Sequence, residues 1–154
     1  ISSMKRILYL LVLLPLGSFA QELYLIIGTY TNTTSKGIYV YRFDVNDATS
    51  NLISTTTASN PSFIAVAPNG KTIFAVNENN PGTVSSFAFN KDSGTLKFIN
   101  TVETKGAHPC YVTIDRKGRH IIVGNYSGGN LSVFDVKEDG SLSAAKQTIQ
   151  HSGN

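Results

Sequence analysis

Three side chains in this sequence could move a proton to or from a bound ligand, namely His108, His151 and Glu78. A histidine titrates near a pKa of about 6.5, so it can take up and return a proton close to pH 7, whereas an exposed glutamate does so poorly. The two histidines are therefore the preferred candidates for acid–base chemistry. For His108, a structural hydrogen bond is about as good an explanation as a role in proton transfer. For Glu78, an exposed salt bridge is likewise about as good an explanation. The residues predicted to bind a ligand through hydrogen bonds are Asn125, Tyr126, Tyr30 and Asn77.

Sequence motifs for other common chemistries are absent from the chain. It contains no Gly-x-Ser-x-Gly nucleophile motif, no phosphate-binding glycine loop and no Cys/His spacing typical of a metal site. Neither a metal nor an organic cofactor is predicted. Cys110 is the only cysteine, which excludes an intramolecular disulfide. We expect Cys110 to be a buried small hydrophobic side chain rather than a nucleophile.

The elements that must position these residues form an internal repeat. Three residues of one unit return 48 residues later in the next: Pro61 as Pro109, Gly70 as Gly118 and Asn77 as Asn125. Two more return after 47 and 46 residues: Gly82 as Gly129 and Leu96 as Leu142. A nearly fixed spacing that drifts only at loops indicates a repeated supersecondary unit.

Each complete unit is predicted to contain four antiparallel strands. In the second unit these are the short apolar runs 62–67, 72–77, 83–89 and 95–102. The turn sequences Pro68-Asn69-Gly70 and Lys91-Asp92-Ser93-Gly94 separate the outer pairs of runs. Four strands in about 40 to 50 residues are typical of a β-propeller blade. The predicted fold class is therefore all-β, a β-propeller of four-stranded antiparallel blades.

The first unit lacks its first strand. Residues 26–31 match 74–79 and 122–127, so the chain enters the pattern at a second strand. We expect three strands in the first unit, at about 23–30, 37–44 and 51–58, and complete blades at about 61–103 and 109–150. Because a propeller needs at least four blades, the count predicts that 21–154 is an N-terminal part of about three blades of a larger ring.

Residues 1–20 are predicted to be a secretory signal peptide with a short upstream extension. Lys5 and Arg6 precede a ten-residue apolar run, and Ser18-Phe19-Ala20 forms a small-x-small cleavage site. A transmembrane anchor is the alternative, but spanning a bilayer takes about 20 apolar residues. The sequence therefore predicts a periplasmic or secreted protein that has no membrane contact after cleavage.

The charge of the chain points to no charged macromolecular partner. The formal net charge is +3, but Lys5 and Arg6 lie in the predicted signal peptide, which leaves 11 basic and 10 acidic residues. Nucleic-acid binding is therefore not predicted, and a small molecule is the expected partner. The sequence does not indicate an oligomeric state.

All seven candidate residues lie at one end of the predicted ring. In an antiparallel blade, the connections after the second and fourth strands lie at one end and those after the first and third at the other. The connections after the first and third strands are tight turns. We call the connections after the second and fourth strands the mouth; they are residues 29–36, 59–60, 77–81, 107–108, 125–130 and 150–151. Loops on a rigid scaffold commonly carry binding and catalytic residues.

Several candidates share a repeat position. Asn77 and Asn125 are equivalent, so a repeated role in the loop is favoured over catalysis for them. Tyr30 and Tyr126 are also equivalent, and aromatic packing explains them about as well as ligand contact does. Glu78 stands where the other two units have tyrosine. Glu78 is therefore less determined by the fold.

The third unit also contains characteristic stretches. They are His108-Pro109-Cys110-Tyr111-Val112, Asp115-x-x-Gly118-Arg119, the run from Val123 through Asn125-Tyr126-Ser127-Gly128-Gly129 to Phe134, Asp139-Gly140-Ser141-Leu142 and His151-Ser152-Gly153. Together they resemble the lactonase family of seven-bladed β-propellers, which includes bacterial 6-phosphogluconolactonases of the propeller type and fungal carboxy-muconate lactonising enzymes. The resemblance covers about residues 23–154 and implies a ring of seven blades.

The resemblance implies a carboxylic-ester hydrolase of carbohydrate metabolism that opens a sugar-type lactone in the central channel without a metal. In this family, further site residues lie in later blades, so these three blades alone are expected to be inactive. A signal peptide departs from the cytosolic role of a 6-phosphogluconolactonase and suggests another lactone. The alternative is a non-catalytic secreted binding or surface module. Such modules have more uniform repeats, and the drift from 48 to 46 residues favours the lactonase.

Lactone opening needs a base that activates water and a group that stabilises the developing oxyanion. His108, His151 and Glu78 are the candidates for the base. Asn125 and backbone N–H groups of the loops are the candidates for the oxyanion, and Tyr126 could bind a sugar hydroxyl.

Overall fold

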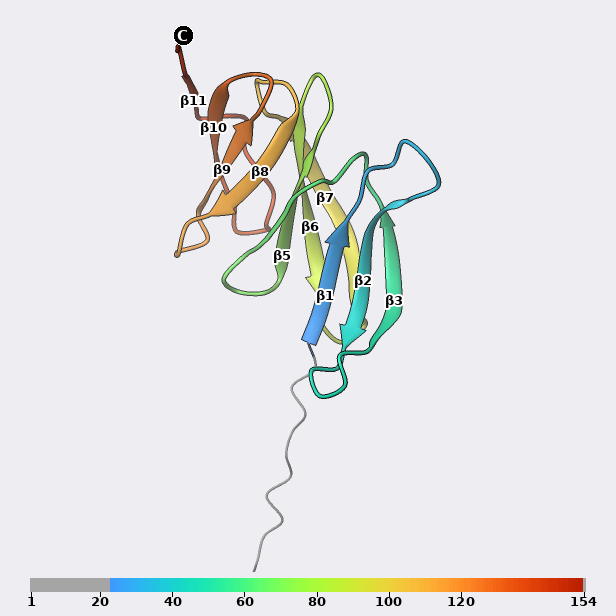
Figure 1. The fold of residues 1–154 in the computed structure, drawn as a ribbon. Helices are drawn as coiled ribbons and strands as arrows, with labels where there is room; N and C mark the ends of the chain where they lie inside the picture. The colour runs from blue at the N-terminus through green and yellow to red at the C-terminus, as the bar shows by residue number, and fades with distance from the viewer. Residues whose placement is uncertain (1–22, 154) are drawn as a thin grey trace, which may run out of the picture.

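The computed structural model describes residues 23–153, and its regular elements are strands without exception in that range (Figure 1). The predicted signal peptide lies outside the described residues. Within 23–153 there is no helix of a length and hydropathy that would span a bilayer.

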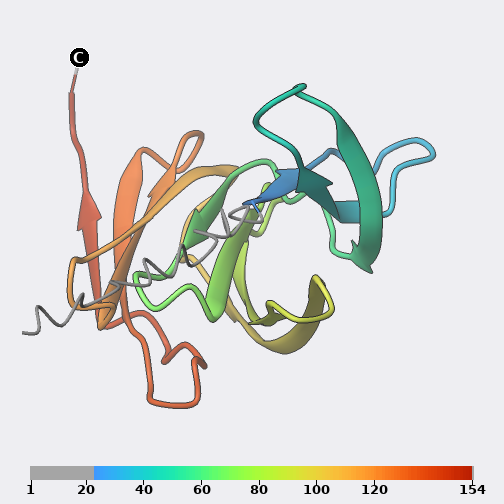
Figure 2. The ribbon, with the colours of Figure 1, turned by 90° about the horizontal axis from the view of Figure 1, so that it is seen from below.

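The strands form three separate antiparallel sheets. The first contains β1 (Leu23–Gly28), β2 (Gly37–Phe43) and β3 (Ser50–Thr57). The second contains β4 (Ile64–Val66), β5 (Thr72–Asn77), β6 (Thr83–Asn90) and β7 (Thr95–Glu103). The third contains β8 (Pro109–Ile114), β9 (His120–Asn125), β10 (Asn130–Asp135) and β11 (Gln147–Gln150). Figure 2 shows the three sheets fanned side by side in chain order.

In each sheet the strands follow one another in chain order, so every connection within a sheet joins neighbouring strands. This meander confirms the predicted blades, including the first with three strands. β1, β5 and β9 hold the same place in the repeat, and so do the strands that follow them. β4 and β8 are the first strands of the second and third sheets, and they pack against each other.

Strand register reproduces the repeat. Ile73 pairs with Phe87 in the second sheet, and Ile121 pairs with Phe134 in the third. The spacing falls from 48 to 47 because the connection from β9 to β10 is one residue shorter than that from β5 to β6. Leu142 forms only an isolated bridge to Val136, and β11 begins five residues later, so the last strand of the third sheet is interrupted.

The first strand of the second sheet is shorter than the predicted run 62–67. β4 spans only Ile64–Val66 because the preceding chain forms a tight turn. Asn60 has a φ of 44°, in the left-handed region, and its carbonyl accepts a hydrogen bond from Ser62 N at 2.8 Å. The regular pairing of the strand therefore begins only after this turn, although Phe63 O already accepts a hydrogen bond from Val76 N of β5 at 3.1 Å.

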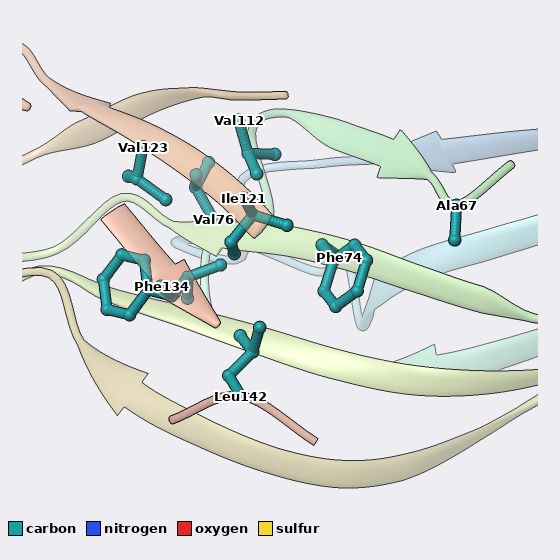
Figure 3. Close-up of a cluster of buried hydrophobic side chains, with 9 residues drawn as sticks. Ala67, Phe74, Val76, Val112, Ile121, Val123, Phe134 and Leu142 are labelled. Carbon is teal, nitrogen blue, oxygen red and sulfur yellow. The ribbon is translucent and has the colours of Figure 1, made fainter. Parts of the chain in front are cut away.

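The main hydrophobic core lies between the second and third sheets (Figure 3). Residues 73–76 of β5 are completely buried, so both faces of this sheet are covered. A smaller cluster of Ile38, Ala75 and Phe87 joins the first and second sheets. The main cluster consists of Ala67, Phe74, Val76, Val84, Val112, Ile121, Val123, Phe134 and Leu142.

The outward faces of the first and third sheets carry exposed apolar side chains. Leu23, Leu25 and Ile27 alternate along β1, and Ile122 and Ile149 lie on β9 and β11. The equivalent strand β5, which has a sheet on either side, exposes none of its apolar residues. The outward faces of the first and third sheets are therefore suited to packing against a further sheet, as both faces of the second sheet are packed.

Candidate functional site

The mouth connections lie together at one end of the three sheets, the upper end in Figure 1. Backbone hydrogen bonds join connections from different sheets. Asn79 O accepts a bond from His108 N at 2.9 Å, and Gly106 O accepts one from Gly82 N at 2.9 Å. The mouth is thus a bonded layer of loops, which is a rigid support for functional side chains.

His108 lies directly before β8 and is held from both sides. Its N–H donates to Asn79 O, and its carbonyl accepts a hydrogen bond from Tyr126 N at 3.0 Å. Its φ is 50°, a left-handed conformation that is uncommon for residues other than glycine and is often found at functional sites. Ring Nδ1 lies 2.9 Å from Ser127 Oγ. The ring is therefore fixed in place at the mouth, as a group for proton transfer requires.

Glu78 forms a bond across two sheets. The hydroxyl of Tyr30 donates to Glu78 Oε2 at 2.8 Å, which links the connection after β1 to the connection after β5. This hydrogen bond is the main cause of a raised pKa of Tyr30, and partial desolvation and the charge of Glu78 raise that pKa further. Of the residues predicted to act at the mouth, these two are in direct side-chain contact.

We expect Glu78→Gln to lower the pKa of Tyr30 toward its ordinary value of about 10, because the carboxylate no longer favours the neutral phenol. A raised pKa in the folded state means that the contact contributes fully to stability below about pH 10 and is lost as the pH rises through the raised value. Ultraviolet titration of the tyrosinates measures the shift, and Tyr30→Phe identifies the transition. An unchanged transition in Glu78→Gln would contradict the assigned cause.

The two equivalent asparagines are buried and tie loops to sheets. Asn77 Nδ2 donates to Ser59 O at 3.0 Å, and its Oδ1 accepts from Ser85 Oγ at 2.7 Å. Asn125 Nδ2 donates to Thr104 O at 3.2 Å and also to the side-chain oxygen of Asn130. This geometry favours the repeated loop role, and ligand binding by Asn77 or Asn125 remains a prediction.

Tyr126 differs from its equivalent, Tyr30. It is 81% exposed, whereas the Tyr30 hydroxyl is bonded to Glu78. The backbone N–H of Tyr126 donates a hydrogen bond to His108 O, so the residue that carries the exposed phenol is held next to the histidine. Tyr126 could therefore reach a ligand that contacts His108.

His151 is not brought together with His108. It follows β11, the last strand of the third sheet, and its N–H donates to Gly129 O at 3.0 Å. His108 precedes β8, the first strand of that sheet. Three strand spacings place the axes of the two strands about 14 Å apart, and no hydrogen bond joins the two rings within residues 23–153. Among the described residues, His151 is exposed at the outer edge of the mouth.

The prediction that Cys110 is buried was wrong, since the side chain is exposed. Pro109 pairs with Asn125 and Tyr111 with Gly124, so Cys110 is the extra residue of a β-bulge. A bulge leaves one residue unpaired and turns its side chain out of the regular alternation. The exposed thiol of Cys110 therefore lies two residues after His108, the candidate for proton transfer.

Sequence reasoning missed Asn60 and Ser127. Asn60 Nδ2 donates to Asn79 Oδ1 at 2.8 Å, while Asn60 Oδ1 accepts from Thr31 N at 2.8 Å. Ser127 contacts the ring of His108. The signal that could have found these residues is the repeat itself, because Asn60 stands 48 residues before His108 and Asn79 stands 48 before Ser127.

Other features of the described residues carry less chemistry. An open groove at the opposite end of the second sheet includes Lys71, Lys91 and Lys97, which are exposed surface lysines. None of the seven candidate residues lines it. No group of three or more His, Cys, Asp or Glu side chains arranged to hold a metal occurs in residues 23–153.

The chain is similar to enzymes that act on gluconolactones. A 6-phosphogluconolactonase of Bacillus subtilis is 32% identical over 129 residues, which cover 82% of this chain and 37% of that protein. The structure of a candidate 6-phosphogluconolactonase of Bacteroides uniformis is 42% identical with a TM-score of 0.83, over 86% of this chain and 39% of that one. The periplasmic gluconolactonase of Pseudomonas aeruginosa is 38% identical with a TM-score of 0.79, over 83% of this chain and 38% of that one.

The chain thus spans between 37 and 39% of the length of these relatives. Residues 24–154 match the family described as "Lactonase, 7-bladed beta-propeller". This match agrees with the three blades of the structure and confirms the resemblance drawn from the third unit. The chain belongs to the lactonase family of seven-bladed β-propellers.

Proposed function

We propose that this chain forms part of a lactonase that hydrolyses a sugar-type lactone of the gluconolactone class. The observation that carries the proposal is the likeness, across the described blades, to proteins named 6-phosphogluconolactonase and gluconolactonase. The same likeness favours an enzyme over a non-catalytic binding module.

In this proposal the chain supplies about three units of a seven-bladed ring. The share of each relative that it spans supports this fraction. The described mouth loops then form part of the rim of a central channel, and the remaining blades complete the site. The three blades alone are expected to lack activity for this reason.

His108 is the base in the proposed reaction. It accepts a proton from a water molecule as the water oxygen bonds to the lactone carbonyl carbon. The ring C–O bond then breaks, and the histidine returns the proton to the departing alcohol oxygen. The product is a hydroxy acid, which at neutral pH ionises to a hydroxycarboxylate and one released proton. Tyr126 is placed to bind a sugar hydroxyl, because it is exposed and its backbone is bonded to that of His108.

We assign the protein to the periplasm or the exterior of the cell, on the basis of the predicted signal peptide in residues 1–20. The similarity to a periplasmic gluconolactonase supports this location. Outside the cytoplasm an unphosphorylated lactone is the more suitable substrate, because phosphorylated gluconolactone is a cytoplasmic metabolite.

The test is to express the full-length protein and follow proton release from gluconolactone and from 6-phosphogluconolactone at constant pH. We expect enzymatic hydrolysis above the spontaneous rate, with a higher kcat/KM for the unphosphorylated lactone. A preference for the phosphorylated lactone would contradict the proposed substrate. Binding of either lactone without hydrolysis would contradict the enzyme and support a binding module.

A further inference from the structure

One side-chain contact is repeated at the same place in the second and third blades. In the second blade Asn60 Nδ2 donates to Asn79 Oδ1 at 2.8 Å. In the third, ring Nδ1 of His108 lies 2.9 Å from Ser127 Oγ. Asn60 and His108 are separated by 48 residues, and so are Asn79 and Ser127. We call each contact a latch, because it fastens the start of a blade to the loop after its second strand.

The backbone around the two latches is also equivalent. The first residue has a φ of 44° in the second blade and 50° in the third, both left-handed. Its carbonyl accepts a hydrogen bond at 3.0 Å in both blades, from Glu78 N and Tyr126 N respectively. The two blades therefore share the left-handed φ and this carbonyl hydrogen bond at Asn60 and His108, although the N–H groups donate to different partners, Thr31 Oγ1 and Asn79 O.

The latches differ in whether the first residue, Asn60 or His108, has a polar side-chain atom left without a hydrogen-bond partner. Asn60 uses both of its polar atoms, because its Oδ1 also accepts hydrogen bonds from Thr31 N and Thr31 Oγ1 of the preceding blade. The residue equivalent to Thr31 in front of His108 is Asn79, whose side-chain atoms bond to Asn60 and Ser59. Within residues 23–153, the second ring nitrogen of His108, Nε2, has no hydrogen-bond partner.

We propose that Ser127 is a positioning residue for His108. Its Oγ accepts a hydrogen bond from Nδ1–H, as Asn79 Oδ1 accepts one from Asn60, and this leaves Nε2 with a lone pair that can take a proton. The repeated latch thus fixes both the orientation and the tautomer of the ring. The effect on catalysis rests on the proposed function, in which His108 is the base.

The experiment compares Ser127→Ala and Ser127→Thr in the full-length protein, with Asn79→Ala as the matched control that loses the other latch. Nitrogen-15 NMR of the imidazole above its pKa, assigned by the signal lost in His108→Gln, reports the tautomer. We expect Nδ1 of His108 to be protonated in the natural protein. In Ser127→Ala we expect the population of the Nε2-protonated tautomer to increase. The kcat of Ser127→Ala should fall about 10-fold with KM within about 2-fold, because a misplaced base slows the chemical step.

Ser127→Thr retains a hydroxyl and should restore both the tautomer and kcat, whereas Asn79→Ala, which keeps the carbonyl that accepts from His108 N, should leave the tautomer unchanged. A ring protonated at Nε2 in the natural protein would overturn the proposal. An altered tautomer with unchanged kcat would overturn the positioning role and leave the lactonase function standing. If neither the natural protein nor any of the variants hydrolyses a lactone, the proposed function fails. The tautomer measured by NMR then still supports or overturns the hydrogen bond from His108 to Ser127.

Discussion

Replacing His108 with alanine in the full-length protein is expected to lower kcat for lactone hydrolysis by about 10²- to 10⁴-fold, the usual contribution of a positioned general base. The reason is geometric as well as chemical. His108 is held by backbone hydrogen bonds to two loops, and its ring is bonded through one nitrogen only. No other histidine among the described residues combines a place at the inner end of the mouth with a fixed ring.

His108→Asn separates proton transfer from structure. Asparagine occupies the equivalent position 60, where it has the same left-handed backbone and donates to residue 79. We therefore expect His108→Asn to keep the thermal stability of the natural protein, donate to Ser127 and yet lose as much activity as His108→Ala. Proton release from gluconolactone gives the rates, and circular dichroism on heating gives the stability.

His151→Ala is the comparison variant. His151 lies at the outer edge of the third sheet, so we expect kcat to change by less than about 10-fold. If both His108 variants keep natural turnover while His151→Ala loses it, the assignment of the base is reversed. Natural turnover in all three would move the proton transfer to blades beyond those described.

The fold could be predicted from the sequence because its main signal is periodic. Pro61 and Pro109, or Asn77 and Asn125, mark equivalent points of two blades, and the turn residues between them mark the strand ends. Repeat spacing also placed Tyr30 and Glu78 at one end of adjacent sheets. Their hydrogen bond could not be foreseen, because it depends on how two loops approach one another.

The errors occur where a single residue breaks the periodic pattern. The bulge at Cys110 depends on the register of β8 against β9, which no local preference encodes. His108 and His151 were grouped because both follow from the order of strands at one end of the blade. Strand order gives the end of the sheet, and the three strand spacings between the first and last strands of a four-stranded blade also give the distance across it, which the prediction left out of account.

Phe74→Ala is expected to lower the free energy of unfolding by about 3–5 kcal/mol, the cost of removing a fully buried aromatic ring and leaving a cavity. Phe74 lies on β5 with no exposed surface, among Val112, Ile121 and Phe134 of the main core (Figure 3). Both neighbours of this sheet belong to the described chain, so its burial does not depend on further blades. Urea unfolding of the full-length protein measures the loss.

Phe98→Ala is the matched control from the same sheet. Phe98 is 54% exposed on β7, and its ring contacts Phe87 at a centroid distance of 5.8 Å. Loss of that edge contact and of half-buried surface should cost about 1 kcal/mol. Equal losses in the two variants would mean that the second and third sheets do not share the tight core described here. The rigid placement of His108, which the contact between β5 and β8 supports, would then lose its physical basis.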